Sequence, residues 1–163
     1  PLMHIIAAKA VGFLEALKPE FQDYIKTVLA NAKILSETLK NNGFKIYSGG
    51  TDTHLMLVDL RPFNVKGNLA SESLSRANIT CNKNGIPFDT ESPMVTSGIR
   101  LGSQAATTRG FGLKEFEKVG NLITKTITGL SKNPDDNSKV EEEVRNEVVS
   151  LCSSFPIYKN LYK

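Results

Sequence analysis

The 163-residue sequence contains few of the residues that build disulfide frameworks and zinc sites: two cysteines and two histidines, namely Cys81, Cys152, His4 and His54. The cysteines lie far apart, and neither belongs to a group with metal-ligand spacing. The sequence therefore predicts no metal site and no disulfide scaffold. Both histidines lie beside apolar residues, without an acid or nucleophile nearby, which favours a structural role. A reducing compartment fits this cysteine content, so we expect a cytoplasmic protein.

Long apolar runs and a strong charge bias are also missing. No apolar stretch approaches the roughly 20 residues that a membrane-spanning helix needs, so no membrane association is expected. The net charge is only +3 and the basic residues are scattered, which argues against nucleic acid as a partner. No signal or transit peptide is visible. Because the chain begins at Pro1 without an initiator methionine, we interpret it as part of a longer protein.

The residues that are present describe one α+β domain. Apolar residues make up 40% and charged residues 23%, as in an ordinary globular domain with a core. Apolar residues at three- and four-residue spacing predict helices over 19–42, 67–77 and 113–130. Another helix is predicted to begin at Ser138, where Ser138 and Glu141 form a capping box. Residues 2–17 predict a helix that is apolar around much of its surface and needs a neighbour.

A short strand at the start of FKIYSGG and three further strands make up the predicted sheet. Residues 55–60 form a continuous apolar run, which predicts a strand buried on both faces or nearly so. A second strand is expected to begin at Ile79, to include Cys81 as a small buried residue, and to end in a Gly-Pro loop. A third strand covers 97–103. The sum is a small sheet covered by helices.

Arg100 is the most unusual residue of the predicted sheet. It stands between Ile99 and Leu101 and is flanked by Gly98 and Gly102, which would let a ligand approach closely. An arginine cannot lose its charge, and burying it unpaired is costly. It therefore needs an anionic partner or a route to water. The partner could be an Asp or Glu across the sheet, or the carboxylate of a ligand, which its planar fork would bind through two hydrogen bonds. The pattern leaves both alternatives open.

Several loops are rich in groups that bind ligands. Residues 82–94 carry Asn84, Asp89 and Ser92, while prolines such as Pro93 stiffen the backbone, and such a loop could hold a planar polar ligand. Residues 48–54 form a second, glycine-rich loop. For Arg109, which precedes a glycine, either a structural turn or a second anion-binding role is possible. No nucleophile elbow, paired-carboxylate site, P-loop or dinucleotide fingerprint is present.

Taken together, six stretches carry a specific resemblance. They are PLMHIIAAKAV, SGGTDTHLMLVDL, RANITCNKNGIPFD, SPMVTSGIRLGS, TTRGF and SSFPIY, and they follow the order and spacing of one family. The chain resembles the C-terminal portion of serine hydroxymethyltransferase (glycine hydroxymethyltransferase) of the bacterial type. The resemblance implies a fold type I, aspartate-aminotransferase-like enzyme. Residues 1–18 would then end the large domain and 19–163 would form the C-terminal small domain.

The resemblance also implies roles for individual residues. Arg100 falls on the arginine that binds the carboxylate of serine or glycine. The folate contacts fall on Asn84, Ser92, Pro93 and Met94, where many relatives have phenylalanine in place of Met94. The full-length enzyme would be a homodimer, or a dimer of dimers, that transfers a one-carbon unit between serine and tetrahydrofolate.

The cofactor of the family is pyridoxal 5'-phosphate, and its ligands are not expected in this chain. The Schiff-base lysine lies in a Thr-His-Lys-Thr type motif that does not occur here, and Lys125 is predicted on an exposed helix face. The phosphate-contacting glycine pair would fall upstream of Pro1. We therefore expect no catalytic residue in this piece and no activity from it alone. Two alternatives stay open: another fold type I enzyme such as an aminotransferase, which would not need the folate loop, or a non-catalytic binding module.

Overall fold

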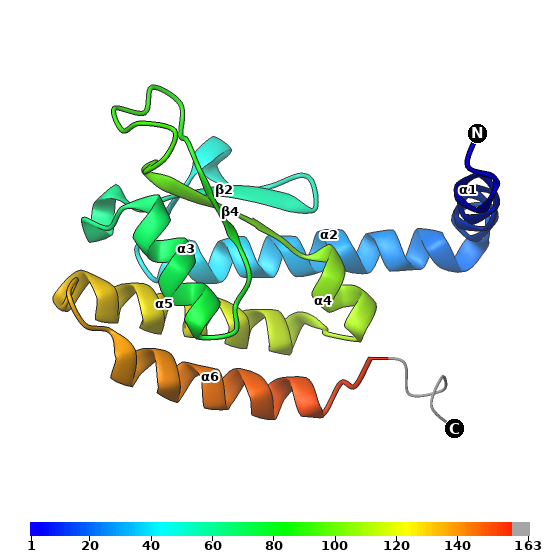
Figure 1. Ribbon diagram of the computed structural model, residues 1–163. Helices are drawn as coiled ribbons and strands as arrows, with labels where there is room; N and C mark the ends of the chain where they lie inside the picture. The colour runs from blue at the N-terminus through cyan, green and yellow to red at the C-terminus, as the bar shows by residue number, and fades with distance from the viewer. Residues whose placement is uncertain (158–163) are drawn as a thin grey trace.

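The computed structural model describes residues 1–157 as six α-helices and one four-stranded sheet (Figure 1), which confirms the predicted α+β class. Two short 3-10 turns cover Tyr47–Gly49 and Arg61–Phe63. The helices are α1 (Met3–Ala16), α2 (Pro19–Asn41), α3 (Gly67–Arg76), α4 (Gln104–Arg109), α5 (Leu113–Lys132) and α6 (Ser138–Ser153). The strands are β1 (Lys45–Ile46), β2 (Leu55–Asp59), β3 (Asn82–Asn84) and β4 (Gly98–Gly102).

The sheet is antiparallel throughout, with the strand order β1-β2-β4-β3. The long helices α2 and α5 run beneath it in Figure 1, and α6 packs against α5 and α3. Side chains alternate between the two faces of a strand, so every second residue of β2 and β4 points at these helices. The helix-facing residues of the two strands are all buried: Met56, Val58, Ile99 and Leu101. The opposite face is exposed at Leu55 and Arg100, whereas Asp59 on the same face is buried.

The long helices form for the reasons that the sequence indicates. Pro19 occupies the first turn of α2, where its fixed φ suits a helix and its missing N–H is not needed. After α2 ends, Gly43 adopts a φ of 92°, a conformation that side chains other than glycine rarely take. The buried stripes of α2 and α5 recur every three or four residues, and their members are Val28, Ala32, Leu35, Leu39, Phe116, Ile123, Ile127 and Leu130.

Two predictions about strands need correction. Residues 55–60 are buried on both faces only toward the end of the run, where Asp59 and Leu60 are 1% and 0% exposed, whereas Leu55 at its start is 36% exposed. The strand expected to begin at Ile79 begins at Asn82, so Cys81 lies just before it. Cys81 nevertheless packs against the core, and its burial raises the pKa of the thiol to about 11.

The predicted capping box at the start of α6 is also wrong. Asn137 is the N-cap residue, and no side chain caps the helix there. The Glu141 carboxylate instead accepts hydrogen bonds from Ser73 Oγ at 2.6 Å and from Arg76 Nε at 2.6 Å, both on α3. Glu141 is therefore a link between two helices rather than a cap.

Arg109 takes a structural role. It ends α4, a helix that the sequence analysis did not predict, and donates to the carbonyl oxygens of Phe155 at 2.7 Å and Cys152 at 3.1 Å. These carbonyls lie at the C-terminal end of α6, where positively charged donors are favoured. Of the two possibilities left open for Arg109, the described residues show the structural one.

Helix α1 stands apart from the rest of the described chain, at the far end of α2 (Figure 1). None of its residues is buried, and large apolar side chains such as Phe13 and Leu14 are more than half exposed. The boundary predicted between residues 18 and 19 stays a prediction. The last quoted stretch, SSFPIY, and the predicted small domain both extend beyond residue 157, outside the described residues. No helix among residues 1–157 is long and apolar enough to cross a bilayer.

Candidate functional site

Arg100 lies in the middle of β4 with its side chain exposed on the open face of the sheet. Leu57 of β2 and Asn82 of β3 are its cross-strand neighbours. Throughout residues 1–157, its guanidinium forms no ion pair and no hydrogen bond with another side chain. Of the two alternatives for Arg100, a carboxylate partner within the sheet is therefore not realised in the described chain.

Asp59, a carboxylate on the same face as Arg100, is already engaged by other cations. Arg61 donates to it through Nη2 at 2.7 Å and Nε at 3.0 Å, and Lys45 Nζ lies 3.9 Å away. Burial raises the pKa of Asp59, but the hydrogen bonds and charge of Arg61 and the charge of Lys45 outweigh that effect and hold the pKa below its usual value. Asp59 therefore stays ionised and paired with Arg61, and Arg100 is left available.

Of the glycines that flank Arg100, Gly98 is needed by the protein itself, whereas Gly102 is only closely packed. A Cβ at Gly98 would lie 2.7 Å from the Val58 carbonyl oxygen, and a Cβ at Gly102 would lie 3.1 Å from Leu55 Cδ2. The close approach that the sequence predicted for a ligand is therefore made by neighbouring strands and side chains. These contacts fix β4, and with it the position of Arg100.

A polar cleft of about 330 Å³ lies beside the end of β3. Three of the four predicted folate contacts line it, namely Asn84, Ser92 and Pro93. Lys83, Gly85, Asp89, Glu91 and Thr96 complete the lining. Met94 and Arg100 are not part of this cleft. The structure thus brings together residues from both ends of the 82–94 loop.

The cleft residues are anchored through main-chain contacts. The Asn84 side chain donates to the Gly85 carbonyl oxygen at 2.7 Å. Lys83 Nζ donates to the carbonyl oxygen of Met94 at 2.6 Å, while the Met94 side chain is 73% exposed. The Met94 backbone is therefore held in place, while its thioether side chain is exposed.

Asp89 is the carboxylate at the centre of this loop. Burial raises its pKa, but hydrogen bonds from the Ser97 hydroxyl and from the N–H groups of Glu91, Ser97 and Ile86 hold the pKa well below its usual range. From the sequence, Asp89 is one of several polar loop residues and has no predicted role of its own. Its partners come from both ends of the loop, which no local sequence pattern reveals.

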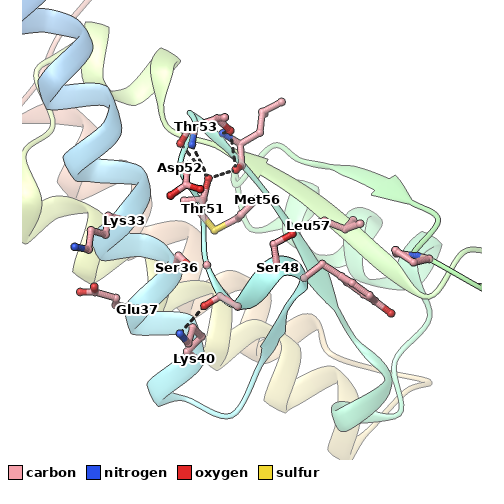
Figure 2. A pocket seen from close by; sticks show the side chains of 15 residues that line it. Lys33, Ser36, Glu37, Lys40, Ser48, Thr51, Asp52, Thr53, Met56 and Leu57 are labelled. Carbon is pink, nitrogen blue, oxygen red and sulfur yellow. Dashed lines mark hydrogen bonds between the residues drawn. The ribbon is translucent and has the colours of Figure 1, made fainter.

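A larger hollow of about 750 Å³ lies between α2 and the 47–53 loop. Lys33, Glu37 and Lys40 of α2 line it together with Asp52 of the loop, and Figure 2 shows Lys40 reaching toward the loop. Lys40 Nζ donates to the Gly49 carbonyl oxygen at 2.6 Å. The loop was expected to bind a ligand, whereas the polar residues of α2 that line the hollow leave no local signal in the sequence.

The described residues do not by themselves fit pyridoxal phosphate. The cofactor needs an amine for its aldehyde and several donors for its phosphate, whereas the cross-strand neighbours of Arg100 are a leucine and an asparagine. Lys45, on the same face, lies over the Tyr47 ring near Asp59. Lys125 is bound by Glu143 and Glu147 on an exposed helix face, as predicted. Residues 1–157 also contain no cluster of three or more potential metal ligands.

The fold and this site define a small α+β domain that presents an unpaired arginine beside a polar loop cleft. The model of the family described as serine hydroxymethyltransferase matches residues 1–123. A relative from Pelagibacter ubique named serine hydroxymethyltransferase is 84% identical over 99% of this chain and 37% of its own length. Relatives from Marinomonas sp. and Ralstonia nicotianae, named serine hydroxymethyltransferase and serine hydroxymethyltransferase 2, are 64% and 61% identical. The chain belongs to the serine hydroxymethyltransferase family.

The match covers nearly all of this chain but only part of each relative. The chain spans 37% of the length of the three relatives named above. Activity, substrates and partners of the complete protein therefore have to be argued from the site.

Proposed function

We propose that this chain is the C-terminal part of a pyridoxal-phosphate-dependent serine hydroxymethyltransferase, which transfers a one-carbon unit between serine and tetrahydrofolate. Family membership supports the reaction, and the single observation that carries the proposal is the exposed, unpaired guanidinium of Arg100 on the open sheet face. The proposal includes a fold type I enzyme in which residues 1–18 end the large domain and 19–163 form the small domain. It also includes a cytoplasmic homodimer.

Arg100 is the residue proposed to bind the amino-acid substrate. Its planar guanidinium matches both oxygens of a carboxylate, so one side chain fixes the position and the rotation of serine or glycine. Lysine would keep the charge but lose the second parallel hydrogen bond. The sheet makes Arg100 suitable for this role, because β4 is held on both sides by β2 and β3.

The cleft at the end of β3 is proposed to bind tetrahydrofolate. Asn84 and Ser92 offer amide and hydroxyl groups to the polar edge of a pteridine, and Pro93 stiffens the turn between them and Met94. The exposed Met94 side chain is unbranched and polarisable, so it can pack against a flat ring. The ligands of pyridoxal phosphate are proposed to lie in the part of the protein that this chain does not span. The chain alone is therefore expected to be inactive.

The test uses the complete reading frame that contains this chain, loaded with pyridoxal phosphate. We expect glycine affinity, measured by calorimetry, to fall about a hundredfold or more in Arg100→Ala and Arg100→Lys, because two charge-assisted hydrogen bonds are lost or weakened. The absorbance of the bound cofactor should persist. Arg145→Lys is the matched control, since Arg145 is an exposed arginine whose Nε donates to the Arg76 carbonyl oxygen on the far helices.

Two results would overturn the proposal. A wild-type protein that does not cleave serine in a tetrahydrofolate-dependent manner would exclude the hydroxymethyltransferase reaction. Glycine affinity that is unchanged in Arg100→Lys and Arg100→Ala would remove Arg100 from the substrate site.

A further inference from the structure

One carboxylate ties together the whole loop between β3 and β4. Asp89 Oδ2 accepts hydrogen bonds from the backbone N–H of Ile86 at 3.1 Å and of Ser97 at 2.9 Å. Its Oδ1 accepts from the backbone N–H of Glu91 at 3.0 Å and from Ser97 Oγ at 2.6 Å. Each oxygen thus accepts two hydrogen bonds, and charge-assisted bonds of this kind are the strong ones.

The partners of Asp89 come from the beginning, the middle and the end of the loop. Ile86 follows Asn84 by two residues, Glu91 directly precedes Ser92, and Ser97 directly precedes β4. Fixing these three points fixes the separation between Asn84 and the 92–94 turn across the cleft. The carboxylate also lines that cleft itself.

The backbone of the loop adopts conformations that it would not keep unaided. Phe88 and Thr96 have φ values of 57° and 62°, in the left-handed region that non-glycine residues disfavour. Phe88 is 98% exposed, so packing of its side chain does not hold it there. Its neighbour Asp89 provides the restraint, because the carboxylate is anchored to backbone groups on both sides of it. Without the carboxylate, the loop is expected to relax.

We infer that Asp89 is a positioning residue for the one-carbon acceptor, holding Asn84 and the Ser92–Met94 turn at the separation that binds tetrahydrofolate. The inference rests on the proposed function. Asp89 acts through the loop and needs no contact with the reacting atoms.

Arg100 is positioned independently of this carboxylate. Its strand pairs with five residues of β2 and three of β3. The flanking residues Ile99 and Leu101 are buried in the core. A change at Asp89 should therefore disturb the folate loop and leave the amino-acid site intact. This separation of two ligands distinguishes a positioning role from general destabilisation.

The experiment uses the complete, cofactor-loaded protein with Asp89→Asn and Asp89→Ala. In Asp89→Asn an NH2 group replaces one carboxylate oxygen, so the two groups that donated to that oxygen lose their acceptor. We expect the KM for tetrahydrofolate in serine cleavage to rise about tenfold in Asp89→Asn and further in Asp89→Ala. The kcat at saturating tetrahydrofolate and the glycine affinity by calorimetry should each stay within about twofold of wild type.

Two further variants serve as a control and as a milder test. Asp136→Asn is the matched control, because the Asp136 carboxylate also accepts a backbone hydrogen bond in a turn, from Ser138 at 3.0 Å, but lies before α6. Asp136→Asn should change neither the KM for tetrahydrofolate nor the affinity for glycine. Ser97→Ala removes only the hydroxyl donor to Asp89 and provides a milder variant if the Asp89 variants do not fold. Its KM for tetrahydrofolate should rise about threefold.

The outcomes separate this inference from the proposed function. If the wild-type protein lacks tetrahydrofolate-dependent cleavage, the proposed function fails and the inference falls with it. If the wild type is active but the KM for tetrahydrofolate is unchanged in the Asp89 and Ser97 variants, the inference alone is wrong. Glycine affinity that falls in parallel with tetrahydrofolate affinity would also overturn it, because that result indicates general destabilisation.

Discussion

The arginines of this chain differ in whether the protein supplies their partners. Arg61 binds Asp59, Arg76 binds Glu141, and Arg109 binds carbonyl oxygens at the end of α6. Arg145 donates to a carbonyl oxygen of α3. Arg100 alone among the arginines forms neither an ion pair nor a hydrogen bond through its guanidinium within residues 1–157. The exposed guanidinium of Arg100 is therefore available to a ligand, as the proposed function requires.

A stability measurement on this chain tests that difference. Arg100→Ala should change the free energy of unfolding by no more than about 0.5 kcal/mol, as for a surface residue without partners. Arg76→Ala should lower it by about 1–3 kcal/mol, because Glu141 would lose its charged donor. Urea denaturation at neutral pH measures both. A loss of 2 kcal/mol or more in Arg100→Ala, judged against the charged-bond range of about 1.5–3 kcal/mol, would show a structural role instead.

At the scale of elements, Glu141 joins two helices that are far apart in sequence. Its carboxylate is 4% exposed, takes two hydrogen bonds from Arg76 and one from Ser73, and so links α6 to α3. Asn137 adds hydrogen bonds to Ser73 and Thr126, which tie the start of α6 to α3 and α5. This buried cluster fixes how the last helix packs.

Removing the charge of Glu141 should therefore weaken the fold in a pH-dependent way. Hydrogen bonds from Arg76 lower the pKa of Glu141 more than burial raises it, so the folded protein favours the ionised form. This stabilisation is complete above the ordinary pKa of about 4.3 and is lost as the pH falls below it. We expect Glu141→Gln to lower the free energy of unfolding by about 1–3 kcal/mol at pH 7.

Urea unfolding at several pH values provides the measurement. The difference between wild type and Glu141→Gln should shrink as the pH is lowered below about 4, because the wild-type carboxylate is then losing its charge. Glu117→Gln, on an exposed position of α5, is the control and should show little difference at any pH. A difference that grows on acidification would contradict the assigned role of Glu141.

Elements with local sequence signals could be predicted, whereas contacts such as those of Glu141 could not. Helices 19–42 and 113–130 were predicted nearly to the residue, because their apolar spacing and the proline and glycine signals are local. The Ser138–Glu141 pair has the local form of a capping box, but Arg76, 65 residues away, recruits the glutamate. Strand β2 has an apolar run typical of two-sided burial, yet its environment depends on which face the helices cover. The partner of Glu141 and the covered face of β2 are set by long-range contacts, which leave no local signal in the sequence.

The candidate site shows the same division. Arg100 and the 82–94 loop could be identified from the sequence, because a charged residue between two apolar ones and a polar, proline-stiffened loop are unusual in themselves. The hydrogen bonds by which Asp89 links the two ends of the loop could not be identified from the sequence, because they depend on the fold bringing Ile86 and Ser97 together. The polar face of α2 beside the larger hollow was hidden for the same reason.

At the scale of the whole molecule, the described chain has one well-packed part and one helix, α1, that is not packed against it. Residues from α2 onward share a continuous core, whereas α1 buries none of its residues. Its exposed apolar side chains include Ile6, Val11, Phe13 and Leu14, spread around the helix. A helix with this surface needs a partner, and the proposed large domain would supply it.

Deletion of residues 1–18 tests this division. Because α1 contributes no buried side chain, the 19–163 chain should unfold at the same denaturant midpoint and with nearly the same m-value as the 163-residue chain. It should also associate less in solution, because the exposed apolar surface of α1 is removed. Circular dichroism during urea unfolding and sedimentation velocity measure the two effects. A clearly lowered midpoint would mean that α1 belongs to the small domain, and the proposed boundary at residue 18 would then be wrong.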